Sequence, residues 1–569
     1  MTVQAAPASK KLLVFGSREA VFIFLGIFFG AGVPLVFLAL FFAWPTATLI
    51  SMGFIDNGSL DLTTFGEVMT AKRTWSVIWQ TLWMAACGTI GSVIFGIPGA
   101  YVLYRTVFPG RTFARAVVAI PFVLPTVAVS VGFRALLSQD GPLGFLGLEG
   151  SMTGIVAAMI FFNMSLVIRS VGSVWAQLDP RMEQAAATLG ASPPRVFATV
   201  TLPSLGPAIA SAASVVFLYC STAYSIVLVL GRIGTATLET EIYMETSHYG
   251  NLNVASVLSI VQLVVVVSAL LMADRARKRV QSTLKMTTHH PARRFTIRDI
   301  PAAFVLIASM TCLVVIPMAA VVVRSLQRKG QWTIANYIDL FSADVSPTLQ
   351  VSVVESLWIS MKTALLSGLI AATVGLCVAL MVSRRPRRRS ARIGLSFLDA
   401  AFMLPLGVSA VTVGFGFLVT LSQPPLDLSS CALLIPCAQA VVAIPLVVRI
   451  ILPVLRAIDP RQREVAATLG ANPARVLATV EGPVMMRSGL VAFGFAVAIS
   501  MGEFGATSFL ARPSTPTLPV VIYQLISRPT AVEQGLAMSG SLVLCVATAL
   551  MMIGLERLNG SQKEGVFHG

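Results

Sequence analysis

Long apolar runs separated by short polar segments make up most of this chain. A helix that crosses a bilayer needs about 20 predominantly apolar residues. Six runs of that length occur in the first part of the chain and six in the second. We therefore expect an all-α polytopic membrane protein with about 12 transmembrane helices. The predicted spans lie at roughly 20–47, 76–104, 113–137, 152–175, 206–231, 253–273, 301–324, 356–383, 395–421, 431–455, 486–510 and 535–555.

One polar segment, between the fourth and fifth predicted spans of each half, occurs twice with an offset of 280 residues. Its copies are DPRMEQAAATLGASPPRVFATVTLP at 179–203 and DPRQREVAATLGANPARVLATVEGP at 459–483, with 16 of 25 positions identical. Connecting loops normally diverge, so this identity argues against two ordinary hairpins. We expect two tandem halves, residues 1–273 and 301–569, joined by a basic linker at 274–300.

Each copy predicts a helix, a turn and a second short helix. In the first copy Asp179 caps a helix that begins at a proline, and Gly190 ends it in the left-handed conformation that glycine tolerates. Pro193 then starts a second short helix that carries Arg195. The second copy repeats the pattern with Asp459, Gly470, Pro473 and Arg475.

Basic residues cluster at the same side of the predicted spans. They occur in the N-terminal segment, after the second span of each half and in the linker, among them Lys10, Lys11, Arg18, Arg105 and Arg384. The positive-inside rule places these segments, both copies of the duplicated segment and both termini in the cytoplasm. An even number of spans per half makes the halves parallel repeats, related by a pseudo-two-fold axis along the membrane normal.

The composition is typical of a membrane protein, and the sequence contains no recognisable catalytic motif. The chain is 56% hydrophobic and 12% charged, with a mean hydropathy of +0.82. Its net charge of +16 lies between apolar segments, which favours membrane topology over a nucleic-acid partner. The sequence contains no GxxxxGK[ST], HExxH or GxSxG motif, and adjacent His289 and His290 alone do not define a metal site. We expect no catalytic residue, metal or cofactor in this chain, so energy must come from a partner or an ion gradient.

The duplicated segment resembles the EAA signature of permease subunits of binding-protein-dependent ABC importers, in which it couples to the ATPase. The second copy matches that pattern, although Val465 replaces its first alanine. The first copy has Gln184 at the glutamate position, with Glu183 one residue earlier; either Glu183 substitutes for it or this half couples through a neutral hydrogen bond. The resemblance implies coupling roles for Glu183, Gln184, Ala186, Leu189, Gly190, Arg195, Glu464, Ala466, Leu469, Gly470 and Arg475.

The resemblance also implies partners and a location. It implies two copies of an ATP-binding cassette ATPase that hold ATP and magnesium, an extracytoplasmic solute-binding protein, and the bacterial cytoplasmic membrane. The fused architecture resembles the thiamine and iron(III) importer permeases, and the PFVLPT and IFFNMS stretches lean toward thiamine. The alternative is a secondary transporter driven by an ion gradient, for which several intramembrane carboxylates or histidines are expected.

Few polar groups lie inside the predicted spans, and each is a functional hypothesis because burial in lipid is costly. Glu503, flanked by glycines in SMGEFGATSF, is the most prominent; it either lines and gates the path or pairs with an arginine near the outer interface. Helix bends at Gly502, Pro125 and Pro405 offer hinges. The candidate path and gate residues are Glu503, Phe504, Gly502, Tyr224, Thr222 and Asn163.

Some features stay open at this stage. The predicted external segments 232–252 and 511–534 share a Thr-Leu and an Ile-Tyr pair, and they either flank the pore or lie as interfacial helices. Asp399 is expected to pair with Arg392. Cys431 and Cys437 are close enough in sequence to pair, but the reduced state is favoured.

Overall fold

The computed structural model describes residues 32–56, 59–60, 62–232, 234–283, 293–342, 344–346, 349–384, 389–422, 424, 427–428 and 430–564. Among these residues 10 helices are long and apolar enough to cross a membrane. The third predicted span of each half contributes only a shorter apolar helix, at Thr126–Leu137 and Ala410–Leu421. The protein is thus an all-α polytopic membrane protein.

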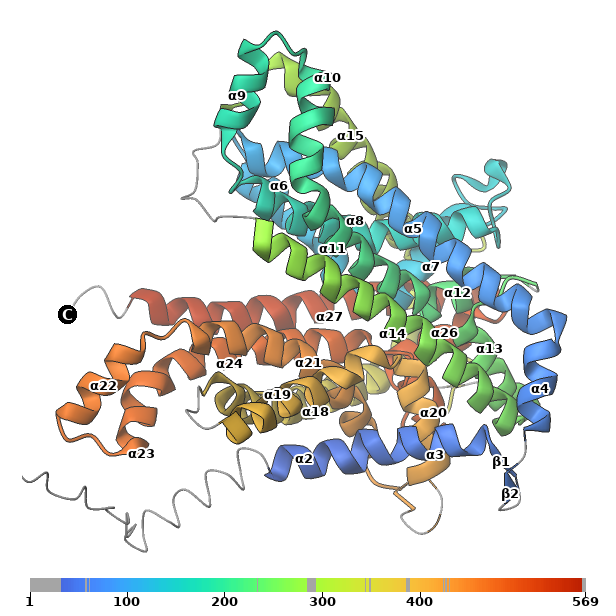
Figure 1. Cartoon of the computed structure of the whole chain (residues 1–569). Helices are drawn as coiled ribbons and strands as arrows, with labels where there is room; N and C mark the ends of the chain where they lie inside the picture. Colours follow the sequence, from blue (N-terminus) through green and yellow to red (C-terminus); the bar gives the residue numbers. More distant parts are fainter. Residues whose placement is uncertain are drawn as a thin grey trace, which may run out of the picture.

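The helices follow the same order in both halves (Figure 1). The first half contains α2 (Val33–Leu38), α3 (Trp44–Met52), α4 (Thr63–Thr70), α5 (Lys72–Arg105), α6 (Arg111–Val123), α7 (Thr126–Leu137), α8 (Met152–Trp175), α9 (Pro180–Thr188), α10 (Pro193–Val196), α11 (Leu202–Ser221), α12 (Tyr224–Leu230), α13 (Leu238–Met244) and α14 (Leu252–Thr283). The second half contains α15 (Ile300–Met310), α16 (Ile316–Ser325), α17 (Ala335–Ile338), α18 (Val353–Ser383), α19 (Arg389–Met403), α20 (Ala410–Leu421), α21 (Leu434–Arg456), α22 (Pro460–Thr468), α23 (Pro473–Val476), α24 (Gly482–Gly502), α25 (Thr507–Leu510), α26 (Leu518–Ile526) and α27 (Ala531–Glu564).

Strands are confined to three short pairs in the described residues. β1 (Ile55–Asp56) pairs with β2 (Ser59–Leu60), and β5 (Gln327–Arg328) pairs with β6 (Gln331–Trp332), both antiparallel. β3 (Thr106–Val107) pairs in parallel with β4 (Arg293–Arg294). This last pair joins the end of α5 to the segment that precedes α15.

Two predicted spans of each half are broken rather than continuous. The third span breaks at Pro125, between α6 and α7, and at Leu404–Gly407, a 3-10 turn that contains Pro405. Proline disfavours helix in the residue before it and lacks an N–H, so a break at these positions is expected. The fifth span breaks after Ser221 in the first half and after Gly502 in the second.

The first span of each half packs against the other half. α3 lies against α14 of its own half and α20 of the second half, while α16 lies against α27 of its own half and α7 of the first (Figure 1). Glycines permit this close approach: a Cβ at Gly132 would lie 3.1 Å from the carbonyl oxygen of Pro317, and one at Gly416 would lie 3.2 Å from Cβ of Pro45. These contacts of α3 with α20 and of α16 with α7 hold the two halves together.

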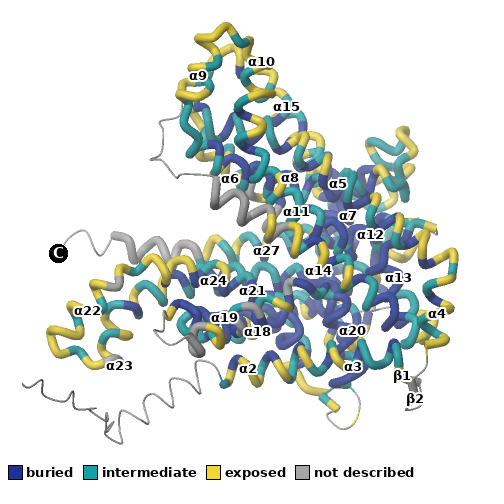
Figure 2. The backbone as a smooth tube through the Cα atoms, in the orientation of Figure 1, coloured by how far each residue is buried: buried dark blue, intermediate teal, exposed yellow. Residues whose placement is uncertain are grey.

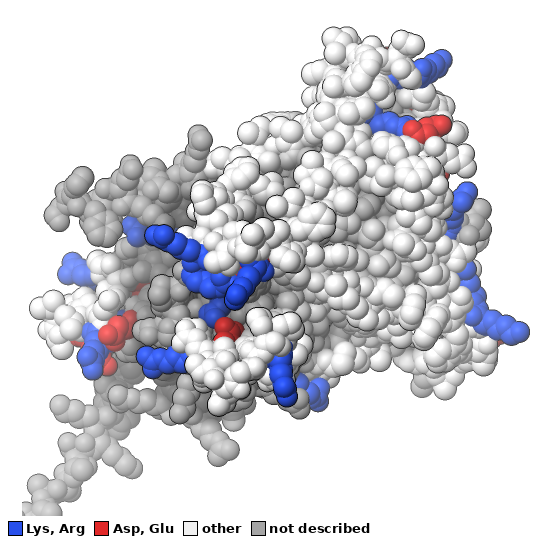
Figure 3. All heavy atoms as spheres, turned by 90° about the horizontal axis from the view of Figure 1, so that it is seen from above, with Lys and Arg blue, Asp and Glu red and all other residues white. Residues whose placement is uncertain are grey.

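The halves meet at one end and diverge at the other. α9 and α10 lie far from α22 and α23 in Figure 1, whereas α12, α13 and α26 lie close together. Figure 2 shows both pairs of short helices largely exposed and the meeting region largely buried. Figure 3 shows charged side chains gathered toward the two ends of the molecule, with a broad uncharged band between them, as a bilayer-spanning protein requires.

Candidate functional site

The duplicated segments fold into two matching hairpins. Asp179 accepts a hydrogen bond from the amide of Arg181 at 2.9 Å, and Asp459 caps α22 identically. Gly190 has φ of +84° and Gly470 has φ of +83°, the left-handed conformation that ends a helix. The amide of Ala191 donates to the carbonyl of Ala186 at 3.1 Å, which completes a Schellman motif. The predicted first helix and turn of each copy are confirmed.

The sequence predicted a short second helix in each hairpin, and this prediction is wrong. α10 continues through the π-helical turn Phe197–Thr201 into α11, giving one helix over Pro193–Ser221. α23 continues in the same way into α24 through Leu477–Glu481. The second helix of each hairpin and the fifth span therefore form one continuous helix, which ends one residue before Thr222 or Glu503.

The tips of the hairpins expose apolar side chains. Leu189 is 89% exposed and Leu469 is 83% exposed. Met182 and Val465 are also exposed on the first helices. Such residues normally mark an interaction surface when they are clustered and uncovered. Gln184 and Glu464 are exposed at equivalent positions, as are Arg195 and Arg475.

An ion pair fixes the base of the first hairpin. Arg105, at the end of α5, lies 2.9 Å from the carboxylate of Glu183, and Thr201 donates to the other carboxylate oxygen at 2.8 Å. Glu183 thus faces the protein, so it does not substitute for the exposed glutamate of the other copy. Gln184 holds that exposed position instead.

The contacts among Arg105, Glu183 and Thr201 form a clamp at the base of the first hairpin. The second hairpin has an equivalent clamp, in which the acidic and basic residues occupy different positions. Glu481 is buried and accepts two hydrogen bonds from Arg384 at 2.8 and 2.7 Å. Nε of Arg463 lies 2.7 Å from Glu481 but is not aligned for a hydrogen bond, so it contributes as an ion pair. By the 280 offset, Arg463 corresponds to Glu183 and Glu481 corresponds to Thr201. The carboxylate has moved from the first helix of the hairpin to the second.

An aromatic cluster occupies the junction of the two halves. Tyr224 stacks on Phe504 with ring centroids 5.3 Å apart and an interplanar angle of 17°. Tyr243 packs on Tyr224 at 5.6 Å, and Tyr523 packs on Phe504 at 5.4 Å. Tyr243 also contacts Phe509, at 5.5 Å. The structure thus brings together Tyr224 and Phe504, two of the residues assigned to the path from sequence.

The other assigned path residues serve local structure. Glu503 is buried and accepts hydrogen bonds from the amides of Ala506 at 2.7 Å and Thr507 at 3.1 Å. The arginine partner considered for Glu503 is not found among the described residues. Gly502 packs against Pro125 of the first half, and the Thr222 hydroxyl donates to a backbone carbonyl.

Asn163 makes its hydrogen bonds within the first half. Its amide donates to the carbonyl of Met159 at 2.9 Å and to the thiol of Cys220 at 3.4 Å. These contacts join α8 to α11 within the first half. The structure therefore does not bring Asn163 to the aromatic cluster.

The segments expected outside the membrane are buried short helices. α13 and α26 pack inside the protein, where Leu238, Ile242, Leu518 and Ile522 are each 0% exposed. This burial argues against the interfacial alternative, and both helices flank the aromatic cluster. The repeated Thr-Leu and Ile-Tyr pairs were the signal for this equivalence.

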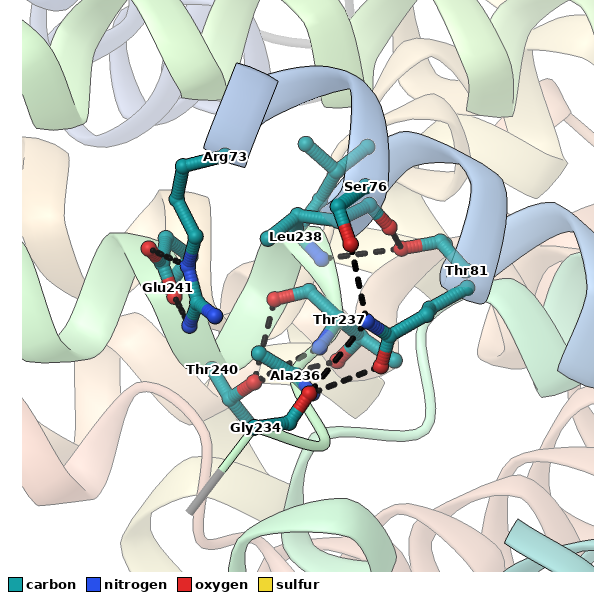
Figure 4. A network of polar contacts seen from close by, with 11 residues as sticks. Arg73, Ser76, Thr81, Gly234, Ala236, Thr237, Leu238, Thr240 and Glu241 are labelled. Carbon is teal, nitrogen blue, oxygen red and sulfur yellow. Dashed lines mark hydrogen bonds and ion pairs between the residues drawn. The ribbon is translucent and has the colours of Figure 1, made fainter. Parts of the chain in front are cut away.

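A polar network holds α13 in place (Figure 4). The hydroxyl of Thr81 accepts from the amide of Leu238 at 3.0 Å, and Arg73 forms two hydrogen bonds of 2.8 Å with Glu241. In the second half Ser360 accepts from the amide of Leu518 at 2.7 Å in the same manner. Figure 4 shows that α5 supplies the side chains that fix the start of α13.

Glu239 is a buried carboxylate that sequence reasoning missed, because its segment was expected in an external loop. It is 0% exposed and accepts a hydrogen bond from Gln262 at 2.8 Å. No ion-pair partner for it occurs in the part of the chain that the structure describes. A carboxyl group in this setting is costly to keep charged.

Several minor predictions concern residues near the ends of the spans and in the linker. Asp399 lies 3.8 Å from Arg456, whereas the side chain of Arg392 lies outside the described residues. Cys431 is exposed and Cys437 is buried, and no disulfide joins them in the structure, so their reduced state stays a prediction. His289, His290, Lys10, Lys11 and Arg18 lie outside the described residues.

The sequence of this chain is similar to those of known transport permeases. Residues 88–282 match the family described as "Binding-protein-dependent transport system inner membrane component". The chain is 28% identical over 505 residues to the thiamine transport system permease protein ThiP of Brucella abortus, covering 86% of this chain and 89% of that protein. It is 26% identical over 498 residues to ThiP of Escherichia coli, covering 85% and 89%. A putative 2-aminoethylphosphonate transport system permease protein, PhnU of Salmonella typhimurium, is 28% identical over 248 residues, covering 41% of this chain and 86% of that protein.

Proposed function

This chain is a fused permease of the ABC importer type, homologous to thiamine permeases, and on that premise we propose that ATP-binding cassette ATPases dock on its hairpins 179–203 and 459–483. The observation that carries the proposal is the pair of exposed apolar tips at Leu189 and Leu469. Exposed apolar side chains promote aggregation when nothing covers them. A partner surface that covers these two leucines would prevent this. Glu464 and Gln184, exposed beside the tips, add polar contacts.

The hairpins transmit the movement of the ATPases to the path. Each hairpin is continuous with a fifth span, and each fifth span ends beside the aromatic cluster. Displacement of the hairpin ends therefore separates or closes the rings of Tyr224 and Phe504. This is alternating access by rocking of two like-oriented halves.

Sidedness and partners follow from the same proposal. The hairpin end faces the cytoplasm together with both termini, in accordance with the basic segments on that side. Two ATPase copies, one for each hairpin, hold the ATP and magnesium. A solute-binding protein delivers substrate at the opposite end, close to α13 and α26.

The substrate is thiamine or iron(III). The ThiP relatives, whose names describe thiamine transport, cover both halves of this chain and favour thiamine. The decisive assay is uptake of labelled thiamine and of chelated iron(III) by a deletion strain complemented with this chain. Uptake of neither solute, with the chain present in the membrane, would overturn this assignment.

The alternative, transport driven by an ion gradient, is tested in proteoliposomes that hold the chain with its ATPases. We expect uptake with ATP that persists when a protonophore or sodium ionophore collapses the gradients. Uptake that requires an ion gradient and does not depend on ATP would contradict the proposal.

A further inference from the structure

A crevice of about 780 Å³ lies at the base of the first hairpin. One wall is the hairpin itself, which contributes Phe197 and Thr201. The other walls are the end of α5, the end of α8 and the start of α15. Apolar side chains make up most of its lining, among them Ile97 and Val305. The crevice therefore lies at the ends of α5 and α8 that adjoin the first hairpin.

An unpartnered hydrogen-bond donor lies in the wall of this crevice. Trp175 is 2% exposed, and its Nε1 has no hydrogen-bond acceptor among the described residues. Its ring is held between Tyr101 at 5.4 Å and Phe197 at 6.2 Å. A buried N–H without an acceptor is rare in a folded protein, so an acceptor from outside the described residues is expected.

A guanidinium group lies at the rim of the same crevice. Arg293 lines it, and the pairing of Arg293 with Thr106 in the β3–β4 ladder fixes its backbone. The side chain contacts Tyr101 and Asp299 yet keeps 48% of its surface exposed. Burial alone would lower the pKa of Arg293, but the hydrogen bond to the Asp299 carboxylate raises it, so the group stays cationic.

The surroundings have the charge and apolarity of a lipid interface. Arg294 and Arg298 are exposed beside Arg293, and the acidic Asp299 is buried. On the outer face of α15, Phe304 is 70% exposed and Ile307 is 64% exposed. Exposed apolar side chains next to exposed arginines mark the boundary between acyl chains and anionic headgroups.

We propose that this crevice binds one anionic phospholipid from the leaflet at the hairpin end. The phosphate accepts hydrogen bonds from the guanidinium of Arg293 and, after a small shift of the crevice wall that exposes it, from Nε1 of Trp175, and an acyl chain lies along Ile97 and Val305. Arginine suits a phosphate because its planar group presents several donors. Lipid binding at this site does not depend on the transport cycle.

The lipid site has no equivalent at the second hairpin. By the 280 offset, Trp175 corresponds to Leu455 and Tyr101 corresponds to Met381. Arg293 belongs to the linker and has no counterpart in the second half. The phospholipid thus contacts the base of one hairpin only.

The test is native mass spectrometry of the purified full chain titrated with phosphatidylglycerol and, separately, phosphatidylcholine. We expect one phosphatidylglycerol to bind at least about tenfold more tightly than phosphatidylcholine, because a charge-assisted contact is lost with the neutral lipid. Arg293→Gln should weaken this binding about tenfold, and Trp175→Phe, which keeps the ring but removes the N–H, about three- to tenfold. The matched control is Arg298→Gln, which removes an equal charge from the same segment outside the crevice and should leave binding unchanged.

Several results would overturn the proposal. One is equal binding of the two lipids, which would indicate an unspecific apolar groove. Another is equal weakening by Arg298→Gln and Arg293→Gln, which would indicate diffuse electrostatic attraction. A third is displacement of the lipid by millimolar glycerol phosphate, which would identify a site for soluble phosphates. If Arg293→Gln impairs folding, the comparison of Trp175→Phe with the unaltered protein still tests whether the crevice binds the lipid.

Discussion

Tyr224 stacks on Phe504, the residue 280 positions further along the chain, with ring centroids 5.3 Å apart. Equivalent positions of two repeats touch each other only on the axis that relates the repeats. Their contact therefore places the pseudo-two-fold axis between these two rings. Because each half supplies one ring, the halves cannot separate at this end without breaking the stack.

The stack should couple the two halves energetically. Tyr224→Ala and Phe504→Ala should each destabilise the protein, and the double variant should lose about 1 kcal/mol less than the sum of both. The measurement is thermal unfolding of the four proteins in one detergent. In liposomes without ATP, the single variants should also leak solute faster than the unaltered protein. Fully additive losses with no leak would show that the rings do not act as a closed gate.

Replacing the clamp residues of the first hairpin with those of the second tests whether the clamp stabilises the hairpin. The two clamps place their acidic and basic residues at different positions. Glu183→Arg alone places a second cation next to Arg105 and should cost about 2 kcal/mol of stability, partly screened by exposure. Adding Thr201→Glu recreates the arrangement of Arg384, Arg463 and Glu481 and should restore most of the loss. Thermal unfolding measures both changes.

The control for this exchange is Thr201→Glu alone. It adds a carboxylate beside Glu183 and should be less stable than the double variant. If Glu183→Arg is no less stable than the unaltered protein, or if Thr201→Glu fails to rescue it, the clamp does not hold the hairpin.

Glu239 should tolerate loss of its charge. Glu239→Gln keeps the shape and a hydrogen bond to Gln262 while removing a carboxyl group that has no ion-pair partner in the described structure. We expect unchanged or higher thermal stability and normal uptake, whereas Glu239→Lys should fail to fold. A stable Glu239→Gln protein with no uptake would instead assign the carboxyl group a role in transport.

Sequence reasoning recovered the features that depend on local chemistry or on repetition. The caps at Asp179 and Gly190 follow from residue preferences, and the break at Pro125 follows from the missing N–H. The equivalence of Tyr224 and Phe504 follows from the 280 offset, and this offset placed both in the candidate path.

Features that depend on which helices meet in space were not predictable. The packing of α3 on α20 requires a long-range choice that hydropathy does not encode. Burial of Glu239 was missed because α13 is too short to register as a span. Glu183 was ambiguous because its partner Arg105 lies 78 residues earlier in the chain.

The most direct test of the account is whether the exposed hairpin tips bind the ATPase. Leu189→Asp with Leu469→Asp should leave the melting temperature unchanged, because both side chains are more than four-fifths exposed. The control is Phe145→Asp, an 80% exposed apolar residue on the connection between α7 and α8. The account predicts that the double hairpin variant loses ATPase binding in a pull-down and ATP-driven uptake, while the Phe145 variant keeps both; full binding and uptake by the hairpin variant would contradict it.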